Sequence, residues 1–198
     1  MTQRGRLITV EGIDGAGKTT LAEGIAHARP GLAVLREPGG VAVSERIREL
    51  VKDPALEVDP RAEALLYAAA RAQLVHERVL PLLAAGDDVL LDRFVDSSLA
   101  YQGAGRGLGV AEVAELNRFA TAGLVPDLTL YVRVDPAVGA ARRGGGDRLE
   151  QAGEAFFVAV VGAYDELAAA EPERVVVLDG SQRPERVLAG ALKALDRL

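Results

Sequence analysis

The residues most able to do chemistry in this chain lie in a glycine-rich stretch near its start. Residues 12–19 read GIDGAGKT and match the pattern G-x-x-x-x-G-K-[ST] in full. Glycines in such a loop let backbone N–H groups converge on phosphate oxygens. The Lys18 ammonium then reaches the β- and γ-phosphates of a nucleoside triphosphate, and the Thr19 hydroxyl binds Mg²⁺. The predicted phosphate site comprises Gly12, Ile13, Asp14, Gly15, Ala16, Gly17, Lys18, Thr19 and Thr20.

The pattern itself is shared by many unrelated functions, so the residues around it are needed to decide which class of nucleotide-binding protein this is. GTPases read their base with N-K-x-D, but the one Asn here, Asn117, is followed by Arg118. Partition-type ATPases carry a second Lys where this chain has Ile13. Hydrolytic motors place a Glu after the strand-end Asp, whereas Asp92 is followed by Arg93. A basic residue beside a metal site suits an anionic acceptor, so a kinase of a small phosphorylated molecule is favoured.

The elements that position these residues are read from short apolar runs that alternate with helical patterns. Alternation with fully apolar strands predicts a parallel sheet covered on both faces, with ligands at the carboxyl ends of the strands. GIDGAGKT, REPGG and DRF each follow such a run, so all three are expected at one edge. We expect strands within 6–11, 32–37, 88–93, 128–134 and 174–179, and helices over 18–29, 42–52, 61–80, 111–121, 137–143, 150–169 and 184–197.

Composition excludes several classes of protein. The 198 residues fit one domain, and 49% are hydrophobic, which argues against disorder. A net charge of −6 argues against a general nucleic-acid binder, and the absence of Cys excludes disulfides and thiolate metal sites. There is no apolar run of membrane-spanning length, and the chain enters a strand pattern almost at once. We therefore expect no signal peptide, no membrane partner and a cytoplasmic location.

Six runs, in register along almost the whole chain, resemble bacterial thymidylate kinases. They are GIDGAGKTT at 12–20, REPGG at 36–40, LLYAAARAQ at 65–73, DRFVDSSLAYQGAGRGL at 92–108, PDLTLYVRVDP at 126–136 and DRLE at 147–150. The resemblance implies transfer of the ATP γ-phosphoryl group to dTMP with Mg²⁺, by a homodimer. It also implies a P-loop NTPase-type three-layer α/β/α fold with a five-stranded parallel sheet. Residues 1–198 would form a single nucleoside monophosphate kinase domain, with a short lid at about 142–149. The alternatives are a kinase of another nucleoside monophosphate, or a nucleotide-gated switch.

Two residues of the helix over 61–80 are implied to bind thymine. On a helical wheel, Tyr67 and Arg71 lie nearly opposite the face that carries Leu65. The resemblance implies that the Tyr67 ring stacks on the base, where the family more often has Phe, and that Arg71 donates to a base carbonyl. The alternative makes Tyr67 a second packing face and Arg71 its solvated neighbour.

Residues after the second and third predicted strands are implied to hold the rest of the acceptor. By resemblance, Arg93 grips the acceptor phosphate and Asp92 supports the water shell of Mg²⁺. Glu37 and Pro38 occupy the acceptor loop in the same comparison. The alternatives are an ion pair that closes a strand end, and a plain turn.

A short helix after DRF is expected to present four further side chains. Ser98 and Gln102 are spaced i,i+4, as are Ser97 and Tyr101, so a helix would aim each pair together. The resemblance places the Tyr101 ring against the deoxyribose, where it leaves no room for a 2′-hydroxyl. Helix capping for Ser97 and a core position for Tyr101 are the alternatives.

Asp14 places a carboxylate inside a loop that binds anions. It cannot accept a hydrogen bond from phosphate, so it must face elsewhere. One reading is a turn in which Asp14 accepts from nearby backbone N–H groups. The resemblance implies instead that Asp14 belongs to the acceptor site, where it accepts from the sugar 3′-hydroxyl and orients arginines.

Catalytic arginines are expected outside the phosphate loop, because Lys18 is the only cation within 12–19. The stretch RRGGGDR at 142–148 is basic and glycine-rich. Glycines make such a segment mobile, as a closing lid must be. The resemblance implies that Arg148 and then Arg143 are catalytic, whereas Arg142 belongs to a helix surface. The alternative is a solvated connection between two helices.

Overall fold

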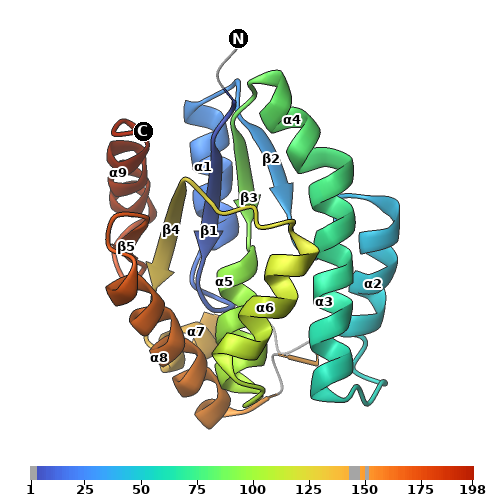
Figure 1. Cartoon of the computed structure of the whole chain (residues 1–198). Coiled ribbons are helices and arrows are strands. Elements are labelled where there is room, and N and C mark those ends of the chain that lie inside the picture. The colour runs from blue at the N-terminus through green and yellow to red at the C-terminus, as the bar shows by residue number, and fades with distance from the viewer. Residues whose placement is uncertain (1–3, 143–147, 150–151) are drawn as a thin grey trace.

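A parallel five-stranded sheet forms the centre of the computed structural model, which describes residues 4–142, 148–149 and 152–198. Its strand order is β2-β3-β1-β4-β5, and every neighbouring pair is parallel (Figure 1). The strands are β1 (Leu7–Glu11), β2 (Ala33–Arg36), β3 (Val89–Asp92), β4 (Leu128–Arg133) and β5 (Val175–Asp179). All five predicted strands and the predicted fold class are confirmed.

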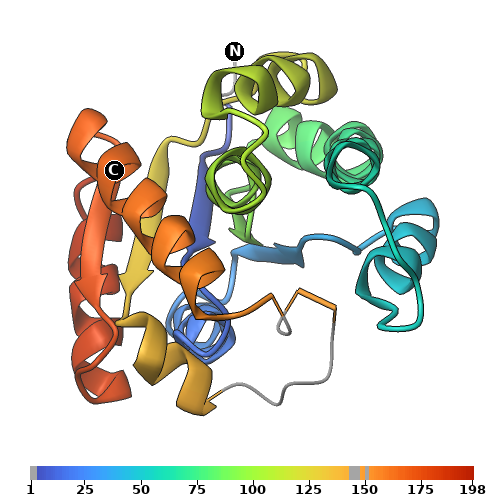
Figure 2. The ribbon, with the colours of Figure 1, turned by 90° about the horizontal axis from the view of Figure 1, so that it is seen from below.

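Helices cover both faces of this sheet. Helices α1 and α9 pack together on one face, while α3, α5 and α8 lie over the other (Figure 2). The helical elements are α1 (Lys18–Ala28), α2 (Ala42–Lys52), α3 (Pro60–Leu74), α4 (Leu80–Ala85), α5 (Val95–Ser98), α6 (Val110–Ala120), α7 (Pro136–Arg142), α8 (Glu154–Ala170) and α9 (Pro184–Leu195). Two π-helical segments, η1 (Val75–Val79) and η2 (Leu99–Gly105), continue α3 into α4 and extend α5. The predicted helix over 61–80 is therefore longer than expected and ends at Ala85.

The exposure of side chains on α3 decides one of the alternatives left open for Arg71. Leu65 is 57% exposed, whereas Arg71 is 2% exposed. The alternative that made Arg71 a solvated neighbour is therefore wrong. The buried face of α3 instead carries Ala64, Ala68 and Leu74 together with Arg71, because this face meets the loops that follow β2 and β3.

Candidate active site

The phosphate loop joins β1 to α1 at the carboxyl edge of the sheet. Gly12, Gly15 and Gly17 all have positive φ, and α1 begins at Lys18 with its N–H groups facing the loop. A side chain at Gly12 would meet the carbonyl oxygen of Val132 at 2.5 Å. Backbone conformation thus favours glycine at all three positions, and close packing adds a second reason at Gly12.

Lys18 is held inside this loop. Its Nζ donates to the carbonyl oxygen of Ile13 at 2.9 Å, and its side chain is 7% exposed. Burial and the positive charge of Arg93 lower the pKa of Lys18 to about 8, against the opposing pull of Asp14. An ammonium buried beside a like charge gains from an anionic ligand, so the position suits a phosphate group.

Asp14, Arg93 and Tyr101 form a polar cluster that adjoins the loop. The Arg93 Nη2 lies 2.6 Å from the Asp14 carboxylate, and the Tyr101 hydroxyl donates to the same carboxylate at 3.0 Å. Burial works to raise the pKa of Asp14, but the charges of Arg93 and Lys18 outweigh it and hold that pKa well below its usual range. Asp14 therefore stays ionised and directs Arg93, as the acceptor-site interpretation expects.

Arg93 occupies a strained backbone position. Its φ is 69°, a left-handed conformation that costs a non-glycine residue on the order of 1–3 kcal/mol. Nη1 donates to the carbonyl oxygen of Gly12 and to Ser97 Oγ, both at 3.1 Å. These bonds and the ion pair with Asp14 hold the guanidinium over the phosphate loop.

Asp92 and Thr19 offer a fitting place for Mg²⁺. Thr19 Oγ1 lies 3.5 Å from Asp92 Oδ2. Among the described residues, Asp92 Oδ1 is buried without a hydrogen-bond partner. The described residues contain no cluster of three or more carboxylate, His or Cys side chains that would hold a metal. One hydroxyl and one carboxylate suit Mg²⁺, which keeps several waters and binds substrate phosphates.

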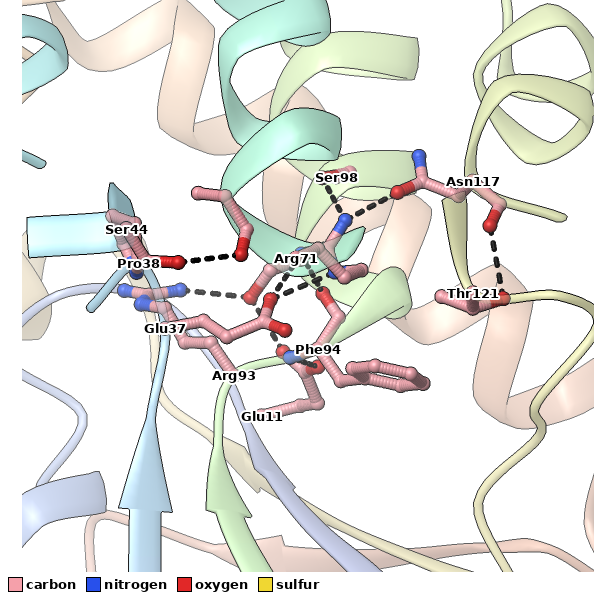
Figure 3. Close-up of polar contacts among 12 residues, drawn as sticks. Glu11, Glu37, Pro38, Ser44, Arg71, Arg93, Phe94, Ser98, Asn117 and Thr121 are labelled. Atoms are coloured by element: carbon pink, nitrogen blue, oxygen red, sulfur yellow. Dashed lines mark hydrogen bonds and ion pairs between the residues drawn. The ribbon is translucent and has the colours of Figure 1, made fainter. Parts of the chain in front are cut away.

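Arg71 lies at the centre of a buried network drawn from four other segments (Figure 3). Nε donates to Glu37 Oε2 at 2.7 Å, and Nη2 donates to the carbonyl oxygen of Phe94 at 2.8 Å. Nη1 donates to Ser98 Oγ at 2.9 Å and to Asn117 Oδ1. The guanidinium is therefore fixed in one plane at the wall of the pocket.

Glu37 keeps one oxygen available in this network. Its side chain is buried, and within the described residues Oε1 has no hydrogen-bond partner. Burial raises the pKa of Glu37 to about 7, although the Arg71 charge opposes the shift. A buried carboxyl oxygen without a partner is costly, so a ligand that donates to Oε1 would relieve this cost.

These clusters line one pocket of about 840 Å³, part of it open to solvent. The predicted acceptor residues are brought together here: the lining includes Asp14, Lys18, Thr19, Glu37, Pro38, Tyr67, Arg71, Asp92, Arg93, Ser98, Tyr101 and Gln102. Phosphate loop and acceptor residues thus share one cavity.

Three lining cations were missed from the sequence. They are Arg36, Arg48 and Lys52. Arg36 directly precedes the predicted acceptor loop, and that position was a usable signal. Arg48 and Lys52 lie on α2, where their spacing resembles an ordinary solvated helix face. With Arg71 and Arg93, they make the lining richer in cations than in carboxylates, which suits an anionic ligand.

Of the two arginines expected to be catalytic in the lid, only Arg148 is among the described residues. Arg143 lies outside the described residues. Arg148 does not line the pocket; its Nη2 donates to Glu63 Oε2 at 2.6 Å and its Nε to the carbonyl oxygen of Val51 at 3.2 Å. The neighbouring Leu149 lines the pocket instead.

Comparison with known proteins gives one consistent family. A family model described as "Thymidylate kinase" matches residues 10–190. A thymidylate kinase of Lactobacillus delbrueckii subsp. bulgaricus is 49% identical, over 96% of this chain and 95% of that protein. One of Deinococcus radiodurans is 48% identical, over 96% of each chain. A crystal structure of thymidylate kinase from Ehrlichia chaffeensis superposes with a TM-score of 0.78 at 29% identity, over 97% of this chain and 99% of the other.

Proposed function

The chain belongs to the thymidylate kinase family, and we propose that it transfers the γ-phosphoryl group of ATP to dTMP, giving ADP and dTDP, a step in dTTP synthesis. The observation that carries the proposal is the shared cavity. The phosphate loop residues Lys18 and Thr19 open into the same pocket as Arg71 and Tyr67. A donor phosphate and an acceptor nucleotide can therefore be held next to each other in one pocket.

On the donor side, the loop from Gly12 to Thr20 binds the ATP phosphates. Lys18 exchanges its bond to the Ile13 carbonyl for phosphate oxygens, and α1 adds its N-terminal N–H groups. Thr19 and Asp92 hold Mg²⁺, which would neutralise charge on the transferring group. The free Oδ1 of Asp92 supports this assignment.

On the acceptor side, Arg93 binds the 5′-phosphate of dTMP and is catalytic, because its bonds to Gly12 and Asp14 hold its guanidinium against the phosphate loop. Asp14 fixes Arg93 and accepts from the sugar 3′-hydroxyl. The Tyr101 ring, whose hydroxyl is tied to Asp14, lies against the deoxyribose. Glu37 and Pro38 close the pocket from the loop after β2.

Thymine is read by Tyr67, Arg71, Ser98 and Gln102, all of which line the pocket. Tyr67 stacks on the base. Both N–H groups of Arg71 Nη1 have partners, so a thymine carbonyl competes with Ser98 and Asn117 for them. A cytosine amino group at the same place would face the Arg71 guanidinium, and because both groups are donors, no hydrogen bond could form between them.

We also propose a cytoplasmic homodimer formed through α3 and α6. These helices pack against each other. Leu65 on α3 is 57% exposed and Phe119 on α6 is 87% exposed, which leaves large apolar side chains for a partner copy to cover. Among the described residues no helix has the length and apolar character needed to cross a membrane. Light scattering on unmodified protein and on Leu65→Glu tests the dimer; equal masses for the two would contradict it.

The activity is tested by ADP formation from ATP and Mg²⁺ with a panel of monophosphates. We expect kcat/KM for dTMP to exceed that for dCMP by about 10⁴, because a mismatched buried polar group discriminates strongly. We also expect deoxyribose to be preferred over ribose. Best turnover with another monophosphate would favour a different nucleotide kinase, and turnover with none would favour a nucleotide-gated switch.

A further inference from the structure

Glu63 is a fully buried carboxylate outside the lining of the pocket. It lies in the first turn of α3, with 0% exposure. Oε1 accepts from Gln102 Nε2 at 2.8 Å and from Arg106 Nε at 3.3 Å. Oε2 accepts from Arg148 Nη2 at 2.6 Å and from Arg106 Nη2 at 3.0 Å. A buried charge with this many partners fixes their positions, because releasing any of them is costly.

One of these partners, Gln102, lines the pocket from η2. A second partner, Arg148, does not line it, but its neighbour Leu149 does. Arg148 is further held by α2: its backbone N–H donates to the carbonyl oxygen of Lys52 at 3.4 Å and its Nε to that of Val51. Leu149 itself packs into the larger hydrophobic core.

We propose that Glu63 is a positioning residue for dTMP: it fixes Gln102 and, through Arg148, Leu149, so that both side chains face the acceptor. Arg148 acts through Glu63 and does not contact the transferring phosphoryl group. This inference rests on the proposed dTMP kinase activity and assigns Arg148 a role different from the catalytic one expected from the sequence.

The engaged hydrogen bonds of Arg148 argue for this role. Its Nε and Nη2 both have partners, and one of those partners is a carboxylate with no exposure. To reach a phosphate over the loop, Arg148 would have to leave both. Glu63 would keep Gln102 and Arg106, but Leu149 would lose the contact that holds its neighbour in place.

The experiment compares Glu63→Gln, Arg148→Met and the double variant, with KM for dTMP, KM for ATP and kcat measured for each. We expect each single variant to raise KM for dTMP about tenfold, as for loss of one charge-assisted hydrogen bond. KM for ATP should stay constant, and kcat should change by less than about threefold. The double variant should have the same KM for dTMP as Glu63→Gln, because Arg148 acts through its contact with Glu63, which is already lost there. Arg148→Lys, which keeps a donor for Glu63, should recover part of the lost dTMP affinity.

Arg106→Met is the matched control. Arg106 bonds to the same carboxylate, but its guanidinium lies over the Phe156 ring and does not line the pocket. It should lower the midpoint of thermal unfolding and leave KM for dTMP unchanged. If Glu63→Gln fails to fold, Arg148→Met and Arg148→Lys decide the matter by themselves.

Two results would overturn the inference. One is a loss of kcat of about a hundredfold in Arg148→Met with KM for dTMP unchanged, which is the effect of removing a charge from the reacting group. The other is an unchanged KM for dTMP in every folded variant. Unmodified protein is assayed alongside and its dTMP binding is measured by calorimetry. If the unmodified protein neither turns over nor binds dTMP, the proposed function is wrong. If the unmodified protein does both and the variants have the same KM for dTMP, only the role of Glu63 is wrong.

Discussion

A carboxylate inside an anion-binding loop is explained by the residue it faces. Asp14 is directed to Arg93 and Tyr101, the residues proposed to bind the acceptor. Arg93 in turn reaches back to the carbonyl oxygen of Gly12. A single ion pair therefore couples the phosphate loop to Arg93, and the negative charge of Asp14 orients a cation.

The first prediction concerns Lys18. We expect Lys18→Ala to lower kcat by about 10²–10³, because it removes a preorganised charge from the transferring group. The fold should survive, since the buried ammonium stands beside the like charge of Arg93. Steady-state kinetics and urea unfolding of Lys18→Ala measure both quantities, with exposed Lys193 changed to Ala as the control. A folded Lys18→Ala protein with near-normal kcat would contradict the assignment.

The second prediction concerns Arg71. Arg71→Lys keeps the charge but loses the planar set of donors, so it cannot serve Glu37, Ser98 and the Phe94 carbonyl together. We expect the ratio of kcat/KM for dTMP to that for dCMP to fall at least about tenfold, and the free energy of unfolding to fall by about 1–3 kcal/mol. The control is Arg118→Lys, a similar change in an exposed ion pair on α6. An undiminished dTMP preference in Arg71→Lys would remove Arg71 from base recognition.

At the scale of elements, the strands and most helices were predictable because local patterns specify them. Apolar runs gave all five strands, and periodicity gave α1 and α2 almost to the residue. The short helix expected after DRF is present as α5, but its π-helical continuation η2 was not predictable. It packs against α6 and α8, so its form depends on contacts distant in the sequence.

The candidate site divides in the same way. Local motifs placed Lys18 and Arg93 at the carboxyl edge of the sheet, because glycine spacing and strand ends are local signals, whereas the place of Tyr101 came from the family resemblance. Asn117 and Glu63 were missed because their partners lie 46 residues away at Arg71 and 85 away at Arg148. Nothing near either residue in the sequence distinguishes it from an ordinary helix position.

The third prediction belongs to the junction of the phosphate loop with α7. Gly15 and Gly17 have similar positive φ, 81° and 96°. A side chain at Gly15 would also meet the carbonyl oxygen of Gly139 at 2.4 Å, whereas one at Gly17 meets nothing within 4 Å. We expect Gly15→Ala to lower the free energy of unfolding by about 1–3 kcal/mol more than Gly17→Ala, because only Gly15→Ala adds overpacking to strain. If urea titrations show the same loss in free energy of unfolding for both variants, α7 shifts to accommodate the added methyl group without destabilising the fold.

At the scale of the whole molecule, Glu11 joins the sheet to the helices above it. Its carboxylate is fully buried at the end of β1 and accepts from the Phe94 N–H at 2.7 Å. It also accepts from the hydroxyls of Ser97 at 2.6 Å and Tyr164 at 2.9 Å. Three segments that carry the site thus meet at one polar group within the core.

This junction predicts how stability depends on pH. Burial, and then the charge of Asp96, raise the pKa of Glu11 above its ordinary 4.5. The folded state thus keeps a proton that the unfolded chain has released, so this contribution is complete below pH 4.5 and is lost as pH rises through the folded pKa. Glu11→Gln cannot titrate, and its two hydroxyl partners can rotate to accept from the amide. We expect the free energy of unfolding of Glu11→Gln, relative to the unmodified protein, to increase from pH 5 to pH 8 in urea titrations. A difference that stays constant or shrinks over that range would mean that Glu11 is ionised in the folded core throughout.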